Sequence, residues 1–324
     1  MSDFTLAVID DEEVPMLWAL ERLESEGVRL LVESAETEAD VTRIGADADV
    51  VLMAVAPITA EVLESLPRCR AVIKSGVGVD TIDLDAAARL GVAVANVGNF
   101  CAIDVAEHAL ALALTLVRRL QLGDSQVRAG RWDRRAVAPV RRFGSLTLGV
   151  IGCGAIGSVL AERWLGLGGK VVAYDPYNEP PAGVEVASSL EELLPRANVL
   201  SIHTGLTAET RGMLGAEELA LLPEGAVFVN ASRGEVVDSD AVVAALESGH
   251  LAAAGLDVWD PEPPPAGSPV LDLPNAIITP HYAGYSEESF DDLRERVVEQ
   301  VLDVRDGRVP RRVLNGVTSL RAVE

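Results

Sequence analysis

Three closely spaced glycines, Gly152, Gly154 and Gly157, stand near the middle of the chain. The apolar run Leu146–Ile151 before them predicts a buried parallel strand, and Ala155–Leu167 after them predicts a helix. In such a strand–loop–helix unit the first glycine permits a tight turn, the second lets a pyrophosphate approach the backbone, and the third lets helix and strand pack closely. Phosphates would bind N–H groups at the helix N-terminus, where the helix dipole favours negative charge.

A carboxylate follows at the distance that a dinucleotide site requires. The predicted strand Lys170–Tyr174 leads to Asp175, which stands 18 positions after Gly157. A carboxylate at this place can accept hydrogen bonds from an adenosine ribose. A glycine-rich turn without a ligand would leave Asp175 unexplained, so the sequence predicts a dinucleotide site.

Polar side chains also follow four more predicted strands. These strands, each with the residues after it, are Val199–Ile202 with His203, Ala226–Asn230 with Ser232 and Arg233, Leu251–Gly255 with Asp257 and Glu262, and Ala276–Thr279 with His281. Ligands of open α/β sheets bind beyond the carboxyl ends of the strands. We therefore expect these side chains to converge where a nicotinamide would lie.

The first hundred residues alternate short apolar runs with helical segments. The predicted strands are Thr5–Ile9, Val28–Val32, Val50–Ala54, Ala71–Lys74 and Val92–Ala95, and the predicted helices are Val14–Glu26, Ala60–Leu66 and Leu84–Leu90. Alternation of this kind predicts a parallel, doubly wound sheet.

Within residues 101–122 four leucines, at 110, 112, 114 and 116, alternate with alanine or threonine, which formally matches a strand. The length and alanine content of the segment favour a helix. A helix with apolar residues all round should be buried, so we expect it to connect two domains and to touch a second subunit. The arginines of 128–135, with Arg141 and Arg142, predict an exposed loop. A last helix is predicted over Glu287–Asp306.

Composition excludes several kinds of partner. The chain of 324 residues carries 27 lysines and arginines against 50 aspartates and glutamates, a net charge of −23, which argues against nucleic acids and anionic membranes. Its longest apolar run, Ala109–Val117, is too short to span a membrane, and we find no secretion signal. Cys69, Cys101 and Cys153 have no metal-ligand spacing, so no metal is predicted, and a cytoplasmic setting fits them.

Seven motifs run through nearly the whole chain in a fixed order. They are Lys74-Ser-Gly-Val-Gly-Val-Asp80, Asn96-Val-Gly-Asn99, Glu107-His-Ala-Leu-Ala-Leu112, Gly152-Cys-Gly-Ala-Ile-Gly157, Asn230-Ala-Ser-Arg-Gly234, Gly255-Leu-Asp-Val258 with Glu262-Pro263, and Thr279-Pro-His281. In this order they resemble the D-2-hydroxyacid dehydrogenase family. Tyr174-Asp-Pro-Tyr177, His203-Thr-Gly-Leu206 and the segment 280–286 look most like the C-terminal binding protein branch. Gly205 stands where most members of the family have proline, and Gly284 stands where this branch usually has tryptophan.

The resemblance implies an NAD-dependent oxidoreductase that transfers a hydride between NAD(H) and a small, anionic 2-oxo or D-2-hydroxy acid. It makes Arg233, Glu262 and His281 catalytic. As imidazolium, His281 can give a proton to the carbonyl oxygen. Glu262 would hold the other ring nitrogen and fix the tautomer, and Arg233 would present its planar fork to the carboxylate.

The resemblance also implies which residues hold the ligands. Those for the cofactor are Gly152, Cys153, Gly154, Ala155, Ile156, Gly157, Asp175, Pro176, His203, Ala231, Ser232, Arg233, Asp257, His281 and Gly284, with Asp257 on the nicotinamide carboxamide. Those for the substrate are Lys74, Ser75, Gly76, Val77, Gly78, Arg233, His281 and Tyr285, where Lys74 and Tyr285 have a structural role as an equal alternative. We expect His108 to be a satisfied structural histidine and His250 to lie in a surface turn.

The predicted architecture is two doubly wound α/β domains with a cleft between them. A flavodoxin-like substrate domain would comprise residues 1–100 completed by 291–324, and a Rossmann domain residues 101–290. A homodimer is expected. A corepressor-like protein that responds to NAD(H) is the alternative from another class, and phosphite oxidation on the same scaffold stays open. A formate dehydrogenase is less favoured, because that family places glutamine where Glu262 stands.

Overall fold

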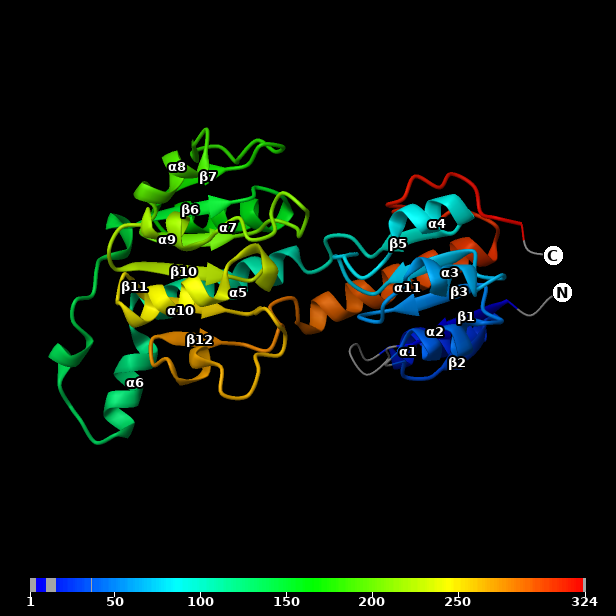
Figure 1. The fold of residues 1–324 in the computed structure, drawn as a ribbon, viewed down its shortest axis with the longest axis horizontal. Helices are drawn as coiled ribbons and strands as arrows, with labels where there is room; N and C mark the ends of the chain where they lie inside the picture. Colours follow the sequence, from blue (N-terminus) through cyan, green and yellow to red (C-terminus); the bar gives the residue numbers. More distant parts are fainter. Residues whose placement is uncertain (1–3, 10–15, 36, 323–324) are drawn as a thin grey trace. The chain divides into compact units, whose positions relative to one another are not determined.

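The computed structural model describes residues 4–9, 16–35 and 37–322, which form two compact units (Figure 1). The first unit comprises the chain up to Phe100 together with Ser286 onward, and the second comprises Cys101–Tyr285. Ser286, where the chain returns to the first unit, caps the last helix.

The first unit is built on a five-stranded parallel sheet. Its strands are β1 (Thr5–Val8), β2 (Arg29–Val32), β3 (Val50–Met53), β4 (Ala71–Lys74) and β5 (Ala93–Asn96), in the order β2-β1-β3-β4-β5. This is the flavodoxin-like order, so the prediction of a parallel, doubly wound sheet is confirmed.

Helices cover both faces of this sheet, because successive strand residues point to opposite sides. Leu6 and Val8 pack with Val297 and Val301 of the last helix, whereas Ala7 belongs to the core on the other face. The helices are α1 (Leu17–Ser25), α2 (Glu38–Gly45), α3 (Ala60–Glu64), α4 (Leu84–Leu90) and α11 (Glu287–Arg305). The expected start of α1 at Val14 lies outside the described residues.

Helix α2 had no counterpart in the sequence prediction. Its signal is a capping box, in which the Thr37 side chain accepts from the Asp40 N–H and the Asp40 side chain accepts from the Thr37 N–H. This motif stabilises a helix N-terminus locally, whatever the hydrophobic pattern that follows.

The second unit contains a seven-stranded parallel sheet. Its strands are β6 (Thr147–Ile151), β7 (Lys170–Tyr174), β8 (Glu185–Val186), β9 (Val199–Ile202), β10 (Ala226–Asn230), β11 (Leu251–Leu256) and β12 (Ala276–Ile278), in the order β12-β11-β10-β9-β6-β7-β8. The strand order reverses between β6 and β9, which is the topological switch point of a Rossmann fold. The Rossmann prediction is confirmed, and only the two-residue edge strand β8 had not been expected.

Two helices pack on one face of this sheet and three on the other. α5 (Ala102–Val117) and α7 (Ala155–Gly166) share a core with alternate residues of β6, among them Leu148 and Val150. The opposite face packs against α8 (Leu190–Leu193), α9 (Ala216–Ala220) and α10 (Ser239–Glu247). A Cβ at Gly255 would lie 2.9 Å from the Cβ of Leu112, so this glycine lets α5 approach β11 closely.

The expected single helix over 101–122 is wrong. α5 ends at Val117, Arg119 takes a left-handed conformation with φ 52°, and a separate helix α6 (Leu120–Arg128) follows. The apolar run ends at this arginine pair, so nothing holds a continued helix to the core. α5 is also buried on one side only, since Ile103 is 55 % exposed.

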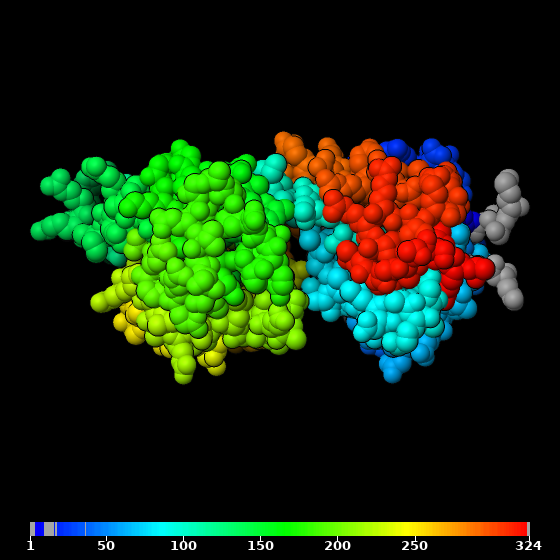
Figure 2. Space-filling model, turned by 90° about the horizontal axis from the view of Figure 1, so that it is seen from above, coloured from blue at the N-terminus to red at the C-terminus, as the bar shows by residue number. Residues whose placement is uncertain are grey.

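Residues 120–142 project from the body of the second unit (Figure 2). No residue of α6 or of the short 3-10 turn Arg134–Val137 is buried. In the described part of the chain, no helix is long and apolar enough to cross a membrane, and no cluster of His, Cys, Asp and Glu could hold a metal ion.

Candidate active site

The glycine loop joins β6 to α7. Gly152 has φ +90°, a conformation that favours glycine, and a Cβ there would lie 2.7 Å from the carbonyl oxygen of His203. A Cβ at Gly157 would collide with the carbonyl oxygen of Gly152. At Gly154 a Cβ would meet nothing within 4 Å. The first and third glycines are therefore required by packing, while the second leaves open space at the start of α7.

Two buried polar atoms beside the loop, Nδ1 of His203 and Oγ1 of Thr204, have no hydrogen-bond partner among the described residues. The Thr204 methyl group lies 3.1 Å from where a Cβ of Gly152 would be. Because buried polar groups are normally satisfied, these atoms fit a polar ligand at this place. The loop and its surroundings therefore fit a dinucleotide.

Asp175, which follows β7, is hydrogen-bonded to the glycine loop. Its carboxylate accepts from the backbone N–H of Cys153 at 2.6 Å, of Tyr177 at 2.8 Å and of Asn178 at 3.0 Å. Partial burial alone would raise the pKa of Asp175, but the hydrogen bonds from Tyr177, Asn178 and Cys153 outweigh it and lower the pKa. A charged carboxylate is thus fixed at the end of β7.

His203 is neutral in this structure. Its Nε2 lies 2.8 Å from Oγ of Ser201, and burial lowers its pKa to about 4. Burial, followed by the nearby Asp175 carboxylate, also raises the pKa of the Cys153 thiol to about 11. Neither residue can therefore exchange a proton readily at neutral pH.

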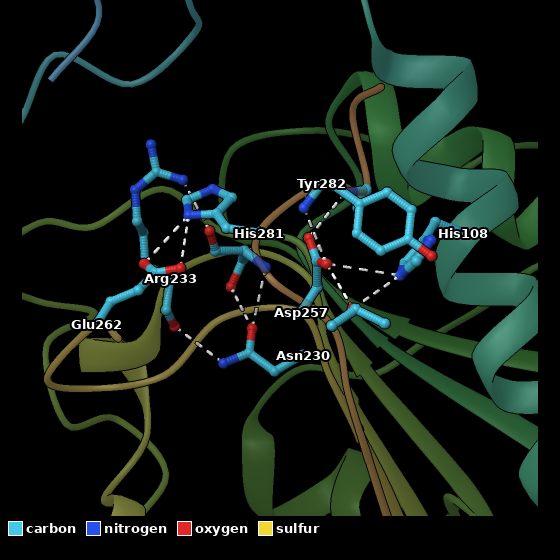
Figure 3. A network of polar contacts seen from close by, with 10 residues as sticks. His108, Asn230, Arg233, Asp257, Glu262, His281 and Tyr282 are labelled. Atoms are coloured by element: carbon cyan, nitrogen blue, oxygen red, sulfur yellow. Dashed lines mark hydrogen bonds and ion pairs between the residues drawn. The ribbon is translucent and has the colours of Figure 1, made fainter. Parts of the chain in front are cut away.

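His281 is paired with Glu262 (Figure 3). Its Nδ1 lies 2.9 Å from Oε1 and 3.1 Å from Oε2 of Glu262, and both side chains are partly exposed. His281 has φ 49°, and its N–H donates to the carbonyl oxygens of Asp257 and Thr279. Positive φ is uncommon outside glycine, so the surrounding loop must hold this backbone in place.

Arg233 lies on a loop that is tied to the buried Asn230 at the end of β10. The Asn230 amide donates to the carbonyl oxygen of Arg233 at 2.9 Å and accepts from the Ser232 N–H at 3.0 Å and hydroxyl at 2.8 Å. One Nη1 hydrogen of Arg233 goes to the carbonyl oxygen of Ser232. The side chain of Asn230 thus shapes the turn that presents the guanidinium.

Gly234 brings this turn against the loop before Glu262. A Cβ at Gly234 would collide with the backbone carbonyl of Trp259 and lie 2.6 Å from the nitrogen of Asp260. Any side chain here would push the two loops apart. Arg233 supplies a positive charge, and Gly234 next to it lets this turn lie close to the backbone of the loop before Glu262.

Asp257, only 1 % exposed, holds the loop that carries His281. Its Oδ1 accepts from the Thr279 hydroxyl at 2.5 Å and from the Tyr282 N–H at 3.1 Å, and its Oδ2 accepts from the Ala283 N–H at 2.9 Å. The contacts that the structure shows for Asp257 are thus internal, and its place on a nicotinamide carboxamide stays a prediction.

The remaining predicted cofactor residues lie at the start of α7 and on the loops that follow the strands. Ala155 and Ile156 begin α7, where no side chain of the described residues caps the helix. Pro176 follows Asp175, and Ala231 precedes Ser232. At Gly284 a Cβ would lie 3.1 Å from Sγ of Cys101, so a large side chain would not fit without a shift.

The predicted substrate loop belongs to the first unit. Lys74 ends β4, and Ser75 donates its hydroxyl to the carbonyl oxygen of Met53 at 3.0 Å. Ser75–Val77 form a bend in which Ser75 is buried and Val77 is exposed. Asn96, buried at the end of β5, donates its amide to the carbonyl oxygen of Val77 at 2.7 Å. Tyr285, the other residue expected at the substrate, is 46 % exposed.

The sequence assigned no role to Asn96, Asn230 or Thr279, which support the loops named above. Each lies at or just after the carboxyl end of a strand, and this position was the available signal. His250 lies after α10, and its Nε2 donates to the carbonyl oxygen of Leu219 at 2.9 Å.

The fold and the glycine loop are those of a dinucleotide-binding α/β domain, and comparison with known proteins identifies its family. Residues 110–283 match the family model of the D-isomer specific 2-hydroxyacid dehydrogenase NAD-binding domain. The chain belongs to this family, and the dinucleotide of its second unit is NAD.

The curated relatives include enzymes that are named for different substrates. The chain is 36 % identical over 274 residues to the D-3-phosphoglycerate dehydrogenase of Methanocaldococcus jannaschii, which covers 83 % of this chain and 52 % of the relative. It is 38 % identical over 267 residues to the glyoxylate reductase of Korarchaeum cryptofilum, which covers 80 % of each chain. This chain therefore spans about half the length of the phosphoglycerate dehydrogenases that it matches.

Solved structures agree in fold. The crystal structure of D-lactate dehydrogenase from Aquifex aeolicus, complexed with NAD and lactic acid, superposes with a TM-score of 0.84 at 31 % identity, covering 94 % of this chain and 96 % of that one. The family and the two α/β units predicted from the sequence are therefore confirmed.

Proposed function

We propose that this protein is an NAD-dependent dehydrogenase that interconverts a small 2-oxo acid and its D-2-hydroxy acid. The pairing of His281 with Glu262, at the strand ends of an NAD-binding domain, is the observation that carries the proposal. A nearby loop supplies the cation Arg233, so the unit offers a proton donor, its orienting carboxylate and an anion-binding group.

The residues divide the work by their chemistry. Nδ1 of His281 donates to Glu262, so Nε2 is left to give a proton to the substrate carbonyl oxygen in reduction and to accept one in oxidation. Arg233 presents its remaining N–H groups to the substrate carboxylate, which a planar guanidinium can hold by two parallel bonds. Bound NADH supplies the hydride.

The loop 74–78 of the first unit would add further donors to the substrate carboxylate. Asn96 fixes this loop through Val77, and Lys74 contributes a positive charge at the end of β4. This role also requires the domain assignment expected from the sequence, in which residues 1–100 with the C-terminal helix bind substrate and 101–290 bind NAD. Tyr285 would border the same substrate.

The projecting segment 120–142 supports a homodimer. Leu120 is 59 % exposed, Val127 51 % and Trp132 91 %. A soluble protein normally covers such a group of apolar side chains, and a second copy paired across a two-fold axis would do so. A cytoplasmic location is proposed as well, since three buried cysteines fit a reducing compartment.

The proposed activity is tested with a panel of 2-oxo acids. Purified protein and NADH are mixed with glyoxylate, pyruvate and 3-phosphohydroxypyruvate, and NADH loss is followed by absorbance. We expect at least one acid to be reduced. Where the product is chiral, as it is from pyruvate and 3-phosphohydroxypyruvate, chiral chromatography should recover the D-hydroxy acid. Phosphite with NAD is the competing assay. Turnover of phosphite but of no 2-oxo acid would refute the proposal.

A further inference from the structure

We infer that His108 is a positioning residue that acts through Thr279 and Asp257 on the loop carrying His281. The inference deepens the proposed function and rests on it. His108 lies on α5, half-buried, and its Nε2 is 3.1 Å from Oγ1 of Thr279, 171 positions later in the chain. Figure 3 shows the imidazole facing Tyr282 and the Asp257 carboxylate.

The direction of each hydrogen bond follows from the partners. The Asp257 carboxylate accepts hydrogen bonds from two backbone N–H groups. Because an ionised carboxylate can only accept, the hydrogen bond with Thr279 uses the hydroxyl hydrogen of Thr279. The oxygen of Thr279 must then accept from His108, which places a hydrogen on Nε2. Burial is the larger influence on the pKa of His108 and lowers it, whereas the Asp257 carboxylate acts in the opposite direction.

This relay ends on the backbone of the catalytic loop. Asp257 accepts from the N–H groups of Tyr282 and Ala283 through its carboxylate, and from that of His281 through its main-chain oxygen at 2.9 Å. The ring of His108 also packs edge-on against Tyr282, with 4.9 Å between centroids. His108 therefore reaches this loop by a polar route and by an apolar one.

The polar route has a consequence for the reaction. His281 holds an uncommon backbone conformation, which persists only while its surroundings determine it. Loss of the Nε2–H donor would leave the half-buried Thr279 oxygen without this donor and loosen the hold of Asp257 on the loop. A small displacement of a proton donor lowers turnover, because the reacting atoms must be aligned.

The variants separate the two routes. His108→Phe keeps the ring against Tyr282 but removes the donor, and His108→Gln restores an N–H near the place of Nε2. Thr279→Val interrupts the relay at its middle. His250→Phe is the matched control, since this half-buried histidine of the same unit donates to the backbone oxygen of Leu219.

Two measurements are made on each full-length variant. Hydrogen–deuterium exchange, followed by mass spectrometry, reports the amides of residues 279–285. We expect about tenfold faster exchange in His108→Phe and Thr279→Val, the effect of losing about one hydrogen bond. The best 2-oxo acid should show kcat about tenfold lower with KM changed by less than about threefold, and the double variant should be no worse than either single one. His108→Gln should recover most of both effects.

If the loop amides of both His108→Phe and Thr279→Val exchange at the rate of the native protein, the inference is overturned, whatever the activity. Faster exchange with unchanged kcat also overturns it, because the loop position would then not matter for turnover. An equal loss of kcat in His250→Phe would show a general effect of destabilisation and overturn it too. If the unsubstituted protein reduces no 2-oxo acid, the proposed function fails, and exchange alone still decides whether His108 holds the loop.

Discussion

Nδ1 of His281 lies 2.9 Å from Oε1 of Glu262, although the two residues stand on different loops, 19 positions apart. The carboxylate can only accept, so it fixes a hydrogen on Nδ1 and leaves Nε2 for the substrate. This contact defines which ring nitrogen does the chemistry.

Replacing His281 by glutamine should abolish most of the activity. Glutamine keeps one hydrogen bond but has no proton to transfer, so we expect turnover to fall by ~10²–10⁴. NADH affinity, measured by fluorescence titration, should change little. A His281→Gln variant that reduces the best substrate at the native rate would show that another group donates the proton.

Replacing Glu262 by glutamine should cost less. The amide still occupies the place of the carboxylate, but it no longer stabilises an imidazolium by its charge. We expect kcat to fall by about 10- to 100-fold, less than for His281→Gln in the same assay. A larger loss for Glu262→Gln than for His281→Gln would contradict the orienting role.

Asp175 should set the choice of cofactor. Its charge, fixed by three backbone N–H groups, should repel the 2′-phosphate of NADP, and charges in contact at a partly wet surface differ by a few kcal/mol. We expect kcat/KM with NADH to exceed that with NADPH by roughly ten- to a thousandfold. Asp175→Ser should narrow this ratio, whereas Glu179→Gln, an exposed control nearby, should not. Equal use of both cofactors by the native protein would refute the prediction.

Acid should destabilise the second unit through His203. Its pKa is about 4 when folded against an ordinary value of 6.5, so the unfolded chain binds the proton first. Stability is then complete above about pH 6.5 and is lost as the pH falls toward 4. Between pH 7 and pH 5 we expect His203 to remove about 2 kcal/mol from the free energy of unfolding in urea. The His203→Gln variant should not show this loss of unfolding free energy. If its unfolding free energy depended on pH in the same way as that of the native protein, His203 would not be the cause.

The proposed dimer depends on the segment 120–142. Light scattering should give twice the 34.2 kDa mass of one chain. Trp132→Glu should shift the protein toward the monomer, because a charge replaces an exposed aromatic ring. Leu167→Glu, at another exposed apolar residue of the second unit, is the control and should leave the mass unchanged. A native protein with the mass of one chain would exclude the dimer.

The sequence by itself determined the two sheets, the glycine loop and the family. These features depend on local rules. Short apolar runs predict buried parallel strands, and the positive φ at Gly152 and the close approach at Gly157 are properties of neighbouring residues in one loop. The carboxyl ends of parallel strands share one edge, so the sequence also predicted which loops carry Arg233, Glu262 and His281.

Only the tertiary structure decided how these loops are held. Asp257 directly follows β11, but its hydrogen-bond donors are Thr279, Tyr282 and Ala283. The relay that includes it begins at His108, on α5. Such contacts join residues far apart in the chain and leave no periodic signal. The break at Arg119 was equally invisible, because helix propensity does not say where the core that supports a helix comes to an end.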